Sequence, residues 1–402
     1  MTPWLSVIGI GDDGLAGLGA PARALIDAAE VVVGGARHLA MAPHAGAERL
    51  PWARSFTDTI AAIAARRGRR VVVLATGDPM WYGAGATLAR HFPGEEMTVI
   101  PHPGAFSLAA ARLGWPLADC VTLSLHGRPL DMLRLHPAEG RRLLLLSADG
   151  STPAAVARLL NETGWGPSRL AVLEHLGGAD AAMHCATAAE WGERRAADLN
   201  TIALECRAAP GTRGLSRLAG LPDTAFAHDG QLTKREIRAA TLAALAPLPG
   251  ERLWDVGAGC GSIAIEWLRA DDHTAAIAIE RDAGRVALIA RNAAMLGVPR
   301  LEIVHGAAPQ ALAGIAPPDT VFAGGGLAEA ALLPVLWQAL RPGGRLVANV
   351  ITTEGERALL DWQAAHGGTL TRLAVSRAEP LGAHRGWRAL APVTQLLCVK
   401  PG

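Results

Sequence analysis

The sequence contains little lysine, few aromatic residues other than tryptophan, and almost no net charge. Lys234 and Lys400 are the only lysines, and 38 Lys and Arg side chains are balanced by 37 Asp and Glu, which leaves a formal charge of +1. Proteins that bind nucleic acid through its phosphates carry a clear basic excess. The composition therefore argues against a nucleic-acid partner, as does the lack of an Asn-Pro-Pro-aromatic motif for a flipped base.

Cysteine is also scarce, and long apolar runs are missing. The five cysteines are odd in number and have no Cys-x-x-Cys spacing, which is typical of reduced cytoplasmic thiols and argues against a zinc site. No apolar run reaches membrane-spanning length, and the N-terminus lacks the basic stretch and apolar core of a secretory signal. We therefore expect a cytoplasmic protein of two domains, with no metal and no membrane partner.

A glycine-rich stretch in the second half is the strongest local signal. Residues 253–256 are predicted to form a buried strand, residues 262–270 a helix, and residues 275–279 a second strand that ends on Glu280. Between the first strand and the helix, glycine alternates with other residues at Gly257, Gly259 and Gly261. Glycine lets the backbone turn sharply and approach a ligand, and the helix N-terminus offers free N–H groups. The pattern indicates an adenosyl ligand whose ribose hydroxyls bind Glu280.

The spacing of the glycines also separates possible ligands. A dinucleotide motif, Gly-x-Gly-x-x-Gly, would place its third glycine at position 262, which is Ser262. An acid, Asp255, stands two residues before Gly257, and it favours a positively charged ligand over a pyrophosphate. The sulfonium and ammonium groups of S-adenosyl-L-methionine fit this charge. The stretch resembles the glycine-rich loop of the Rossmann-like methyltransferases.

Further motifs in the second half resemble the Rossmann-like methyltransferases that act on precorrins. They are Pro222-Asp223-x-x-Phe226-x-His228-Asp229-Gly230, Thr233-Lys234-Arg235-Glu236, the glycine turn, and Ala323-Gly324-Gly325-Gly326. The resemblance implies that Thr233 lies near the cofactor, that Glu280 binds ribose, and that Gly306 and Ala307 border the adenine. An Asp often stands where this chain has Ala307, so only backbone contact is expected there. Alternatively, Thr233 caps or begins the helix expected from there to Leu245.

The first half shows strands alternating with helices, which predicts a mostly parallel sheet. Four of its motifs resemble the tetrapyrrole methylase family over residues 1–207. They are Gly9-x-Gly11, Thr76-Gly77-Asp78-Pro79, Pro103-Gly104-Ala105-Phe106-Ser107 and Leu125-His126-Gly127-Arg128. The resemblance implies a two-lobed fold that holds S-adenosylmethionine in a cleft. The residues expected to contact it are Thr76, Gly77, Asp78, Trp81 and Ser107. By itself, the Gly-Asp-Pro sequence could be an ordinary turn. The family usually has Gly-x-Gly-Pro-Gly in its first loop, where this chain has Gly11-Asp12-Asp13-Gly14.

Regular patterning lapses between Cys206 and Gln231, so we place the domain boundary there. The expected fold is α/β throughout: a two-lobed tetrapyrrole methylase domain at 1–207, followed by a Rossmann-like class I methyltransferase domain at 208–402. Strands at 169–174 and 201–205 are expected to end the first half. After the boundary, helices are expected at 284–295 and 329–339.

The pairing of these two modules resembles the family of precorrin-6B C(5,15)-methyltransferases (decarboxylating) of cobalamin synthesis. The resemblance implies methylation of carbons 5 and 15, removal of the ring C acetate carboxyl, a precorrin substrate and two S-adenosylmethionine sites per chain. We also expect a homo-oligomer. Two alternatives are a methyltransferase for another tetrapyrrole and a cofactor-sensing protein with one inactive half. Loss of carbon dioxide, seen in the product mass, separates the first reading from the other tetrapyrrole. Titration of cofactor onto each isolated half tests for a sensor, which should bind the cofactor without turning over any precorrin.

Other polar residues near the motifs leave two readings open. His126, His228 and His305 lie at loop edges and are either functional or simply solvated. The arginine-rich segment with Arg377, His384, Arg385 and Arg388 could clamp substrate carboxylates or form a solvated surface. No residue is singled out as catalytic. No lysine is placed for a Schiff base, so the substrate's own conjugated ring is expected to act as the electron sink.

Overall fold

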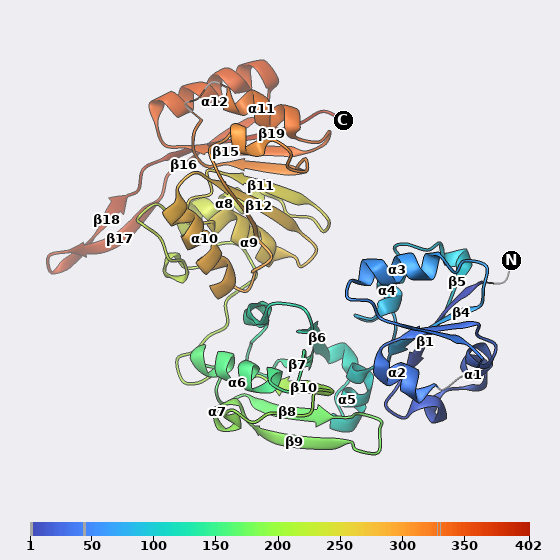
Figure 1. Ribbon diagram of the computed structural model, residues 1–402. Coiled ribbons are helices and arrows are strands. Elements are labelled where there is room, and N and C mark those ends of the chain that lie inside the picture. The colour runs from blue at the N-terminus through green and yellow to red at the C-terminus, as the bar shows by residue number, and fades with distance from the viewer. Residues whose placement is uncertain (1–2, 43–45, 328, 330) are drawn as a thin grey trace. The chain divides into compact units, whose positions relative to one another are not determined.

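The computed structural model describes residues 3–42, 46–327, 329 and 331–402. The chain forms two compact units (Figure 1). The first contains residues 1–130 and 137–213, and the second contains residues 131–136 and 214–402. The second unit is therefore built from two separate pieces of the chain.

The first unit begins with a lobe built on a five-stranded parallel sheet. The strand order is β3-β2-β4-β1-β5, and each neighbouring pair is parallel. The elements are β1 (Leu5–Ile10), α1 (Ala20–Asp27), β2 (Val31–Gly34), α2 (Ala36–Met41), β3 (Glu48–Pro51), α3 (Phe56–Ala64), β4 (Val71–Thr76), α4 (Ala84–Leu88) and β5 (Met97–Ile100). Ile8 and Leu74 pack with residues of α1 and α2, whereas Val7 and Val73 pack with residues of α3 and α4. The strand alternation thus fills a core on each face.

The second lobe of this unit has a different sheet, in the order β6-β7-β10-β8-β9. Its elements are α5 (Ala105–Leu113), β6 (Cys120–Ser124), β7 (Arg142–Leu146), α6 (Thr152–Glu162), β8 (Arg169–Glu174), β9 (Ala182–Thr187), α7 (Ala188–Trp191) and β10 (Asn200–Glu205). Only β6 and β7 are parallel, and the other pairs are antiparallel. The expectation of a mostly parallel sheet is wrong for this lobe. The cause is β9, which pairs directly with β8 as a largely exposed edge strand and has no apolar pattern to reveal it.

The second unit is built on a seven-stranded sheet in the order β13-β12-β11-β14-β15-β19-β16. The first five strands of this order are parallel, and β19 and β16 are antiparallel additions. The elements are α8 (Arg235–Leu245), β11 (Arg252–Val256), α9 (Ser262–Ala270), β12 (Ala275–Glu280), α10 (Ala283–Met295), β13 (Glu302–His305), β14 (Thr320–Ala323), α11 (Leu332–Ala339), β15 (Arg345–Val350), α12 (Thr353–His366), β16 (Thr369–Leu373), β17 (Ser376–Leu381), β18 (His384–Ala389) and β19 (Val393–Val399). The strand order reverses beside β11, which is where open α/β sheets bind their ligands.

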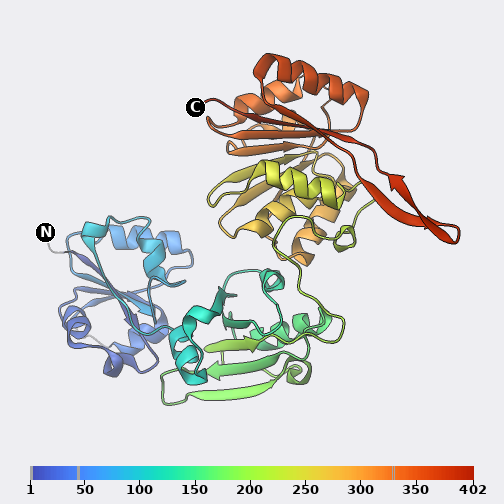
Figure 2. The ribbon, with the colours of Figure 1, turned by 180° about the vertical axis from the view of Figure 1, so that it is seen from behind.

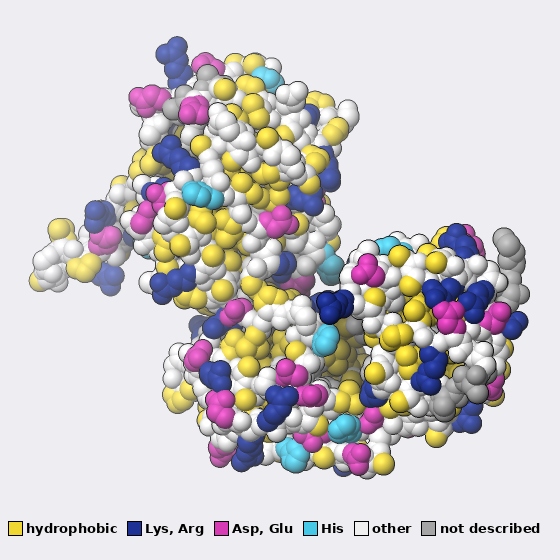
Figure 3. Space-filling view, viewed as in Figure 1, with side chains coloured by type: hydrophobic (Ala, Val, Ile, Leu, Met, Phe, Trp, Pro, Cys, Tyr) yellow, Lys and Arg dark blue, Asp and Glu magenta, His cyan; other side chains and the backbone are white. Residues whose placement is uncertain are grey.

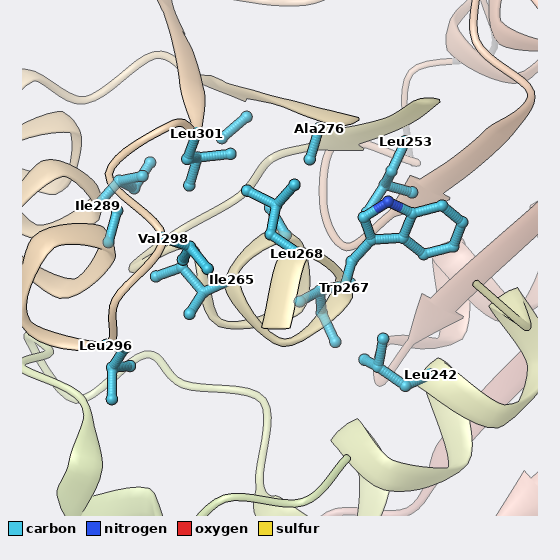
Figure 4. Packing of buried hydrophobic residues seen from close by; sticks show 14 of the residues in the cluster. Leu242, Leu253, Ile265, Trp267, Leu268, Ala276, Ile289, Leu296, Val298 and Leu301 are labelled. Carbon is cyan, nitrogen blue, oxygen red and sulfur yellow. The ribbon is translucent and has the colours of Figure 1, made fainter. Parts of the chain in front are cut away.

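Helices cover both faces of this sheet (Figures 1 and 2). One core contains residues of α8, α9 and α10, and the other contains residues of α11 and α12. Figure 4 shows the first core around Trp267, which is fully buried and donates its indole N–H to the carbonyl of Ala275 at 3.0 Å. Leu135, from the segment 131–136, belongs to the same core. A Cβ on Gly297 would lie 2.8 Å from its Cγ, so the absence of a side chain at 297 makes room for Leu135.

Several element boundaries differ from expectation. Helix α8 begins at Arg235, with Lys234 as its N-cap, so Thr233 lies just outside the helix and is not its cap. Of the helix expected at 329–339, residue 330 lies outside the described residues, and α11 starts at Leu332. The hairpin of β17 and β18 forms a two-stranded sheet of its own and extends away from the seven-stranded sheet (Figures 1 and 2).

Neither the surface charges nor the helices that the structure describes indicate a membrane or a strongly charged partner. Basic and acidic side chains are interspersed on the face shown in Figure 3. Within the described part of the chain, no helix is both long enough and apolar enough to cross a membrane.

Candidate cofactor sites

The glycine turn of the second unit needs glycine for conformational reasons. Gly257, Gly259 and Gly261 have φ angles of +72°, +60° and +81°, which side chains disfavour. A Cβ on Gly257 would lie 3.2 Å from the backbone nitrogen of Gly325, and one on Gly261 would lie 3.0 Å from Ile289. The turn joins β11 to α9 at the carboxyl edge of the parallel strands. It is therefore a tight backbone cradle at the topological switch of the sheet.

Glu280 ends β12 beside this turn. Its side chain is almost fully buried. One carboxylate oxygen accepts a hydrogen bond from the backbone N–H of Gly259 at 2.8 Å, and the other accepts one from Asp282 at 3.0 Å. An ionised carboxylate has about four acceptor positions, so Glu280 can hold the turn and still accept hydroxyl groups.

Asp255 lies beneath the turn, with only 1% of its surface exposed. Its Oδ2 accepts a hydrogen bond from the N–H of Ala264 in the first turn of α9 at 3.0 Å. Burial raises its pKa to about 7, against the effect of the Ala264 hydrogen bond and with a smaller contribution from the negative charge of Glu280. Oδ1 is buried and has no partner within the described residues. An orphaned buried acid fits a cationic ligand, because a nearby positive charge would keep the carboxylate ionised.

The turn after β13, which contains Gly306 and Ala307, lies at the same edge of the sheet. The N–H of Gly306 donates to the carbonyl of Glu280 at 2.9 Å, so β13 ends beside the ribose-binding candidate. Ala307 follows and is exposed. His305 is also exposed, and its ring nitrogen lies 3.1 Å from the carbonyl oxygen of Arg281. The structure thus brings together Gly306, Ala307, Glu280 and the glycine turn.

The segment 220–233 crosses this region and carries Thr233. A Cβ on Gly259 would lie 4.0 Å from the carbonyl oxygen of Gln231, so the segment passes beside the glycine turn. The carbonyl of Thr233 accepts a hydrogen bond from Arg238 at 2.5 Å. We call residues 220–233 the strap.

Three buried polar residues that the sequence did not reveal hold the strap. Arg238 is fully buried and pairs with Glu266 of α9 at 2.6 Å. Glu266 also accepts the N–H groups of Gly220 and Leu221. Asn292 of α10 exchanges two hydrogen bonds with the backbone of Ala227 and donates a third to the carbonyl of Cys260 in the glycine turn. The side-chain amide of Asn292 therefore links the strap to the glycine turn.

The acidic and arginine motifs of this unit have structural partners. Asp223 pairs with Arg238 and with Arg377 of β17, and Arg377 also pairs with Glu236. These two arginines hold the pKa of Asp223 below its usual value, against the effect of burial. Arg388 pairs with Glu379 within the hairpin. Arg377 therefore ties the hairpin to the strap, and this role accounts for its charge without a substrate.

The first unit contains a cleft between its two lobes. It is lined by Gly11, Asp12, Arg37, Thr76, Gly77 and Pro103 from the first-lobe side, and by Ala105 and Leu108 of α5 together with Leu173, Leu176, Leu199, Asn200 and Thr201 from the second lobe. A Cβ on Gly77 would lie 2.8 Å from the Cα of Gly104, so the loops after β4 and β5 pack backbone to backbone. Of the five residues expected to contact a cofactor, Thr76 and Gly77 line the cleft.

The other three expected residues lie nearby, outside the cleft lining. Asp78 accepts the N–H of Met80 at 2.8 Å and so stabilises the turn. Trp81 is 55% exposed. Ser107 is exposed and lies in the first turn of α5.

Arg37 of α2 lines the cleft and its neighbour His38 contacts a cleft residue, Thr76; neither could be found from the sequence. Arg37 donates to Asp12 at 2.7 Å and to the hydroxyl of Thr76 at 3.3 Å. His38 is buried and lies 3.0 Å from the same hydroxyl. Burial, and then the charge of Arg37, lower the pKa of His38 to about 4, so it is neutral at pH 7. Asp12 also contacts His175 of the second lobe at 3.1 Å. Position 12, which departs from the family pattern, thus joins the two lobes at the cleft.

The described residues contain no cluster of three or more His, Cys, Asp or Glu side chains that could hold a metal ion. His228 accepts the N–H of Gly230 at 3.0 Å and shapes the strap, and His126 is exposed.

Known proteins match both units. A family model of tetrapyrrole (corrin/porphyrin) methylases matches residues 5–191, and a model of the precorrin methyltransferase domain matches residues 224–400. A precorrin-6Y C(5,15)-methyltransferase (decarboxylating) from Sinorhizobium sp. is 50% identical over 98% of this chain and 96% of its own.

Two shorter relatives match less than half of the chain each. A cobalt-precorrin-7 C(5)-methyltransferase from Salmonella typhimurium is 34% identical over 43% of this chain and 85% of its own. A probable cobalt-precorrin-6B C(15)-methyltransferase (decarboxylating) from Pyrobaculum aerophilum is 35% identical over 45% of this chain and 94% of its own. Given half-identity along nearly the whole of both chains, the protein belongs to the precorrin-6Y C(5,15)-methyltransferase (decarboxylating) family, S-adenosylmethionine-dependent C-methyltransferases of cobalamin biosynthesis.

Proposed function

We propose that the two methylations are divided between two cofactor sites on one chain. Residues 208–402 methylate carbon 15 and remove the carboxyl of the ring C acetate, and residues 1–207 methylate carbon 5. The observation that carries this proposal is the presence of two unlike glycine-shaped sites, the turn after β11 and the cleft at Gly77. The two shorter relatives support it, because each is named for one of the two activities and each matches less than half of the chain.

In the second unit, the proposed cofactor contacts are Glu280 for ribose, the backbone of Gly306 and Ala307 for adenine, and the turn with Thr233 and Asp255 for the amino-acid end. The first unit would use Thr76, Gly77, Asp78, Trp81 and Ser107. Bound S-adenosylmethionine supplies an electrophilic methyl group on a sulfonium. The cradle at Gly257 and the orphaned Oδ1 of Asp255 fit such a cationic ligand. The chain's own contribution is to hold donor and acceptor carbon in line, which lowers the barrier through orientation.

Methylation and decarboxylation can proceed without a catalytic lysine. Lys400 donates to the carbonyls of Trp337, Gln338 and Leu340 at the end of α11, and Lys234 is the N-cap of α8. When the acetate loses carbon dioxide, the electron pair of the broken carbon–carbon bond can enter the protonated, conjugated macrocycle. The carbon 15 bridge adjoins ring C, so this step belongs with the carbon 15 methylation.

Two full-length variants test the division of activities by mass spectrometry of the products. At a cofactor concentration below the wild-type Kd, Glu280→Ala should slow carbon dioxide release from precorrin-6B about ten- to a hundredfold, in line with its weaker cofactor binding. Gly77→Val, which places a side chain against Gly104, should still release carbon dioxide and add a single methyl group. Carbon dioxide release at the wild-type rate in Glu280→Ala, or its loss in a folded Gly77→Val protein, would contradict the assignment.

We further propose a cytoplasmic homo-oligomer. The five free cysteines support a reducing compartment. The β17–β18 hairpin supports assembly with a second copy, because isolated two-stranded ribbons are marginally stable and this one leaves Leu381 69% and Trp387 79% exposed. Light scattering should give a mass above that of one chain, and Trp387→Ser should lower it. A wild-type protein that is monomeric at micromolar concentration would rule this out.

A further inference from the structure

The loop after Gly77 carries a group of exposed apolar side chains beside the cleft of the first unit. Met80, Trp81 and Tyr82 are consecutive, and 47%, 55% and 42% of their surfaces are exposed. Scattered exposed apolar residues are normal, but a contiguous group of large ones indicates a binding surface. Thr76 and Gly77, a few residues earlier in the same loop, line the cleft. We call Met80, Trp81, Tyr82 and the adjacent Arg128 the shelf.

Tyr82 is fixed in an unfavourable backbone conformation. Its φ angle is +55°, in the left-handed region that a tyrosine rarely adopts. Three contacts hold it there. Its hydroxyl donates to the carbonyl of Thr122 at 3.2 Å, its ring meets Phe106 edge-on at 6.1 Å, and the guanidinium of Arg128 lies 4.8 Å from its ring centroid. Such strain persists where surrounding contacts over-determine it, which is common at ligand sites.

Arg128 provides an available positive charge at this surface. Its side chain is exposed and stacks on Tyr82, and none of the described carboxylates forms an ion pair with it. A stacked guanidinium keeps the N–H donors at its edge free, and these bind a carboxylate in a bidentate manner. By contrast, Arg37 in the cleft is already paired with Asp12.

Helix α5 joins the shelf to the cleft. Ala105 and Leu108 line the cleft, and Phe106, between them in sequence, contacts the ring of Tyr82. A ligand on the shelf would therefore lie next to whatever occupies the cleft. A methyl acceptor needs this adjacency to a methyl donor.

We propose that the shelf binds the methyl-accepting macrocycle of the first unit, with Met80 and Trp81 against the flat conjugated ring and Arg128 paired with one of its peripheral carboxylates. The occupant is chosen by complementarity: a flat apolar face meets the exposed Met80 and Trp81, and an acidic edge meets the unpaired guanidinium. This proposal rests on the proposed function, since it assumes that the first unit methylates the macrocycle.

The test uses the full-length protein with precorrin-6B and saturating S-adenosylmethionine. Methylation at carbon 5 is followed by mass spectrometry as a function of macrocycle concentration. Arg128→Gln should raise the macrocycle KM of the carbon 5 methylation about tenfold or more, as expected for a lost hydrogen bond to a charged group. Arg128→Lys should restore part of the loss, and carbon dioxide release should keep its rate. Cofactor affinity, measured by calorimetry, should also stay unchanged.

Arg112→Gln is the matched control, because Arg112 is an exposed arginine on α5 outside the shelf. An unchanged KM in Arg128→Gln would overturn the proposal, and so would an equal effect in Arg112→Gln. If Arg128→Gln instead impaired carbon dioxide release and spared the carbon 5 methylation, the assignment of activities to the two units would be wrong. Thermal unfolding of each variant identifies any loss of fold, and Met80→Ala, at a shelf position with no assigned cofactor contact, then provides an independent test of the same surface.

Discussion

The carboxylate of Glu280 lies 2.8 Å from the backbone nitrogen of Gly259, so the acid that ends the second strand also fixes the glycine turn after the first. One side chain therefore couples the ribose-binding candidate to the shape of the cradle. Its substitution affects both.

We predict that Glu280→Ala weakens cofactor binding to the second unit about ten- to a hundredfold. Hydrogen bonds to a charged group contribute about 1.5–3 kcal/mol, and Ala removes them. Glu280→Gln keeps an acceptor for the Gly259 N–H and should lose less. Calorimetry on the full-length protein measures both, with the site in the first unit as internal reference. Equal affinities in wild type and Glu280→Ala would remove Glu280 from the ribose site.

Cofactor stoichiometry should be close to two per chain. Each unit presents its own candidate site, and Gly77→Val should leave only the one in the second unit because a Cβ at Gly77 meets the Cα of Gly104. Calorimetry should then report about one. A wild-type stoichiometry of one, unaltered by Gly77→Val, would mean that the first unit does not bind the cofactor.

The stability of the ligand-free second unit should fall as the pH rises toward 7. Burial raises the pKa of Asp255 to about 7 from a usual 3.8. A carboxyl whose pKa is higher in the folded state costs nothing below its unfolded pKa, and destabilises increasingly as pH rises toward the folded value. Asp255→Asn should therefore gain stability over wild type between about pH 4 and 7, by a few kcal/mol, and level off above. Thermal unfolding across this range measures the difference.

Saturating cofactor supplies the control for Asp255. A bound cation would stabilise the ionised carboxylate, so wild type should then lose its pH dependence and overtake Asp255→Asn. If the two proteins respond to cofactor alike, Asp255 does not interact with the ligand's charge.

Arg238→Met should destabilise the second unit by about 3–5 kcal/mol, because it leaves Glu266 buried without its partner. The double variant Arg238→Met with Glu266→Met should recover part of this loss. Denaturant unfolding monitored by tryptophan fluorescence gives the values. A double variant less stable than the single one would show that Glu266 matters chiefly for the strap backbone, to which it accepts two hydrogen bonds.

The sequence could predict features whose cause is local. The glycines at 257, 259 and 261 and the acid at 280 follow from a strand, turn and helix pattern, and the positive φ angles at the three glycines confirm that conformational need. Asn292 could not be found this way, because its role depends on Ala227 and Cys260, which are distant in sequence. Strand β9 was not predicted for another reason: an exposed edge strand lacks the apolar alternation that burial imposes.

Arg37 illustrates the same limit in the first unit. Nothing adjacent in sequence marks it, yet it bonds to Asp12, which follows β1, and to Thr76, which ends β4. Only the packing of α2 beside the ends of β1 and β4 brings these groups together.

The segment 131–136 has a consequence for synthesis and dissection of the protein. Leu135 leaves the ribosome before the rest of the second unit exists, and its place beside Gly297 forms only after residues 137–213 have been made. Until the core of the second unit is made, Leu135 lacks the neighbours that bury it in the finished protein. A single cut near residue 214 therefore does not separate two intact folding units. It leaves residues 131–136, and with them Leu135, on the N-terminal fragment, although they belong to the second unit.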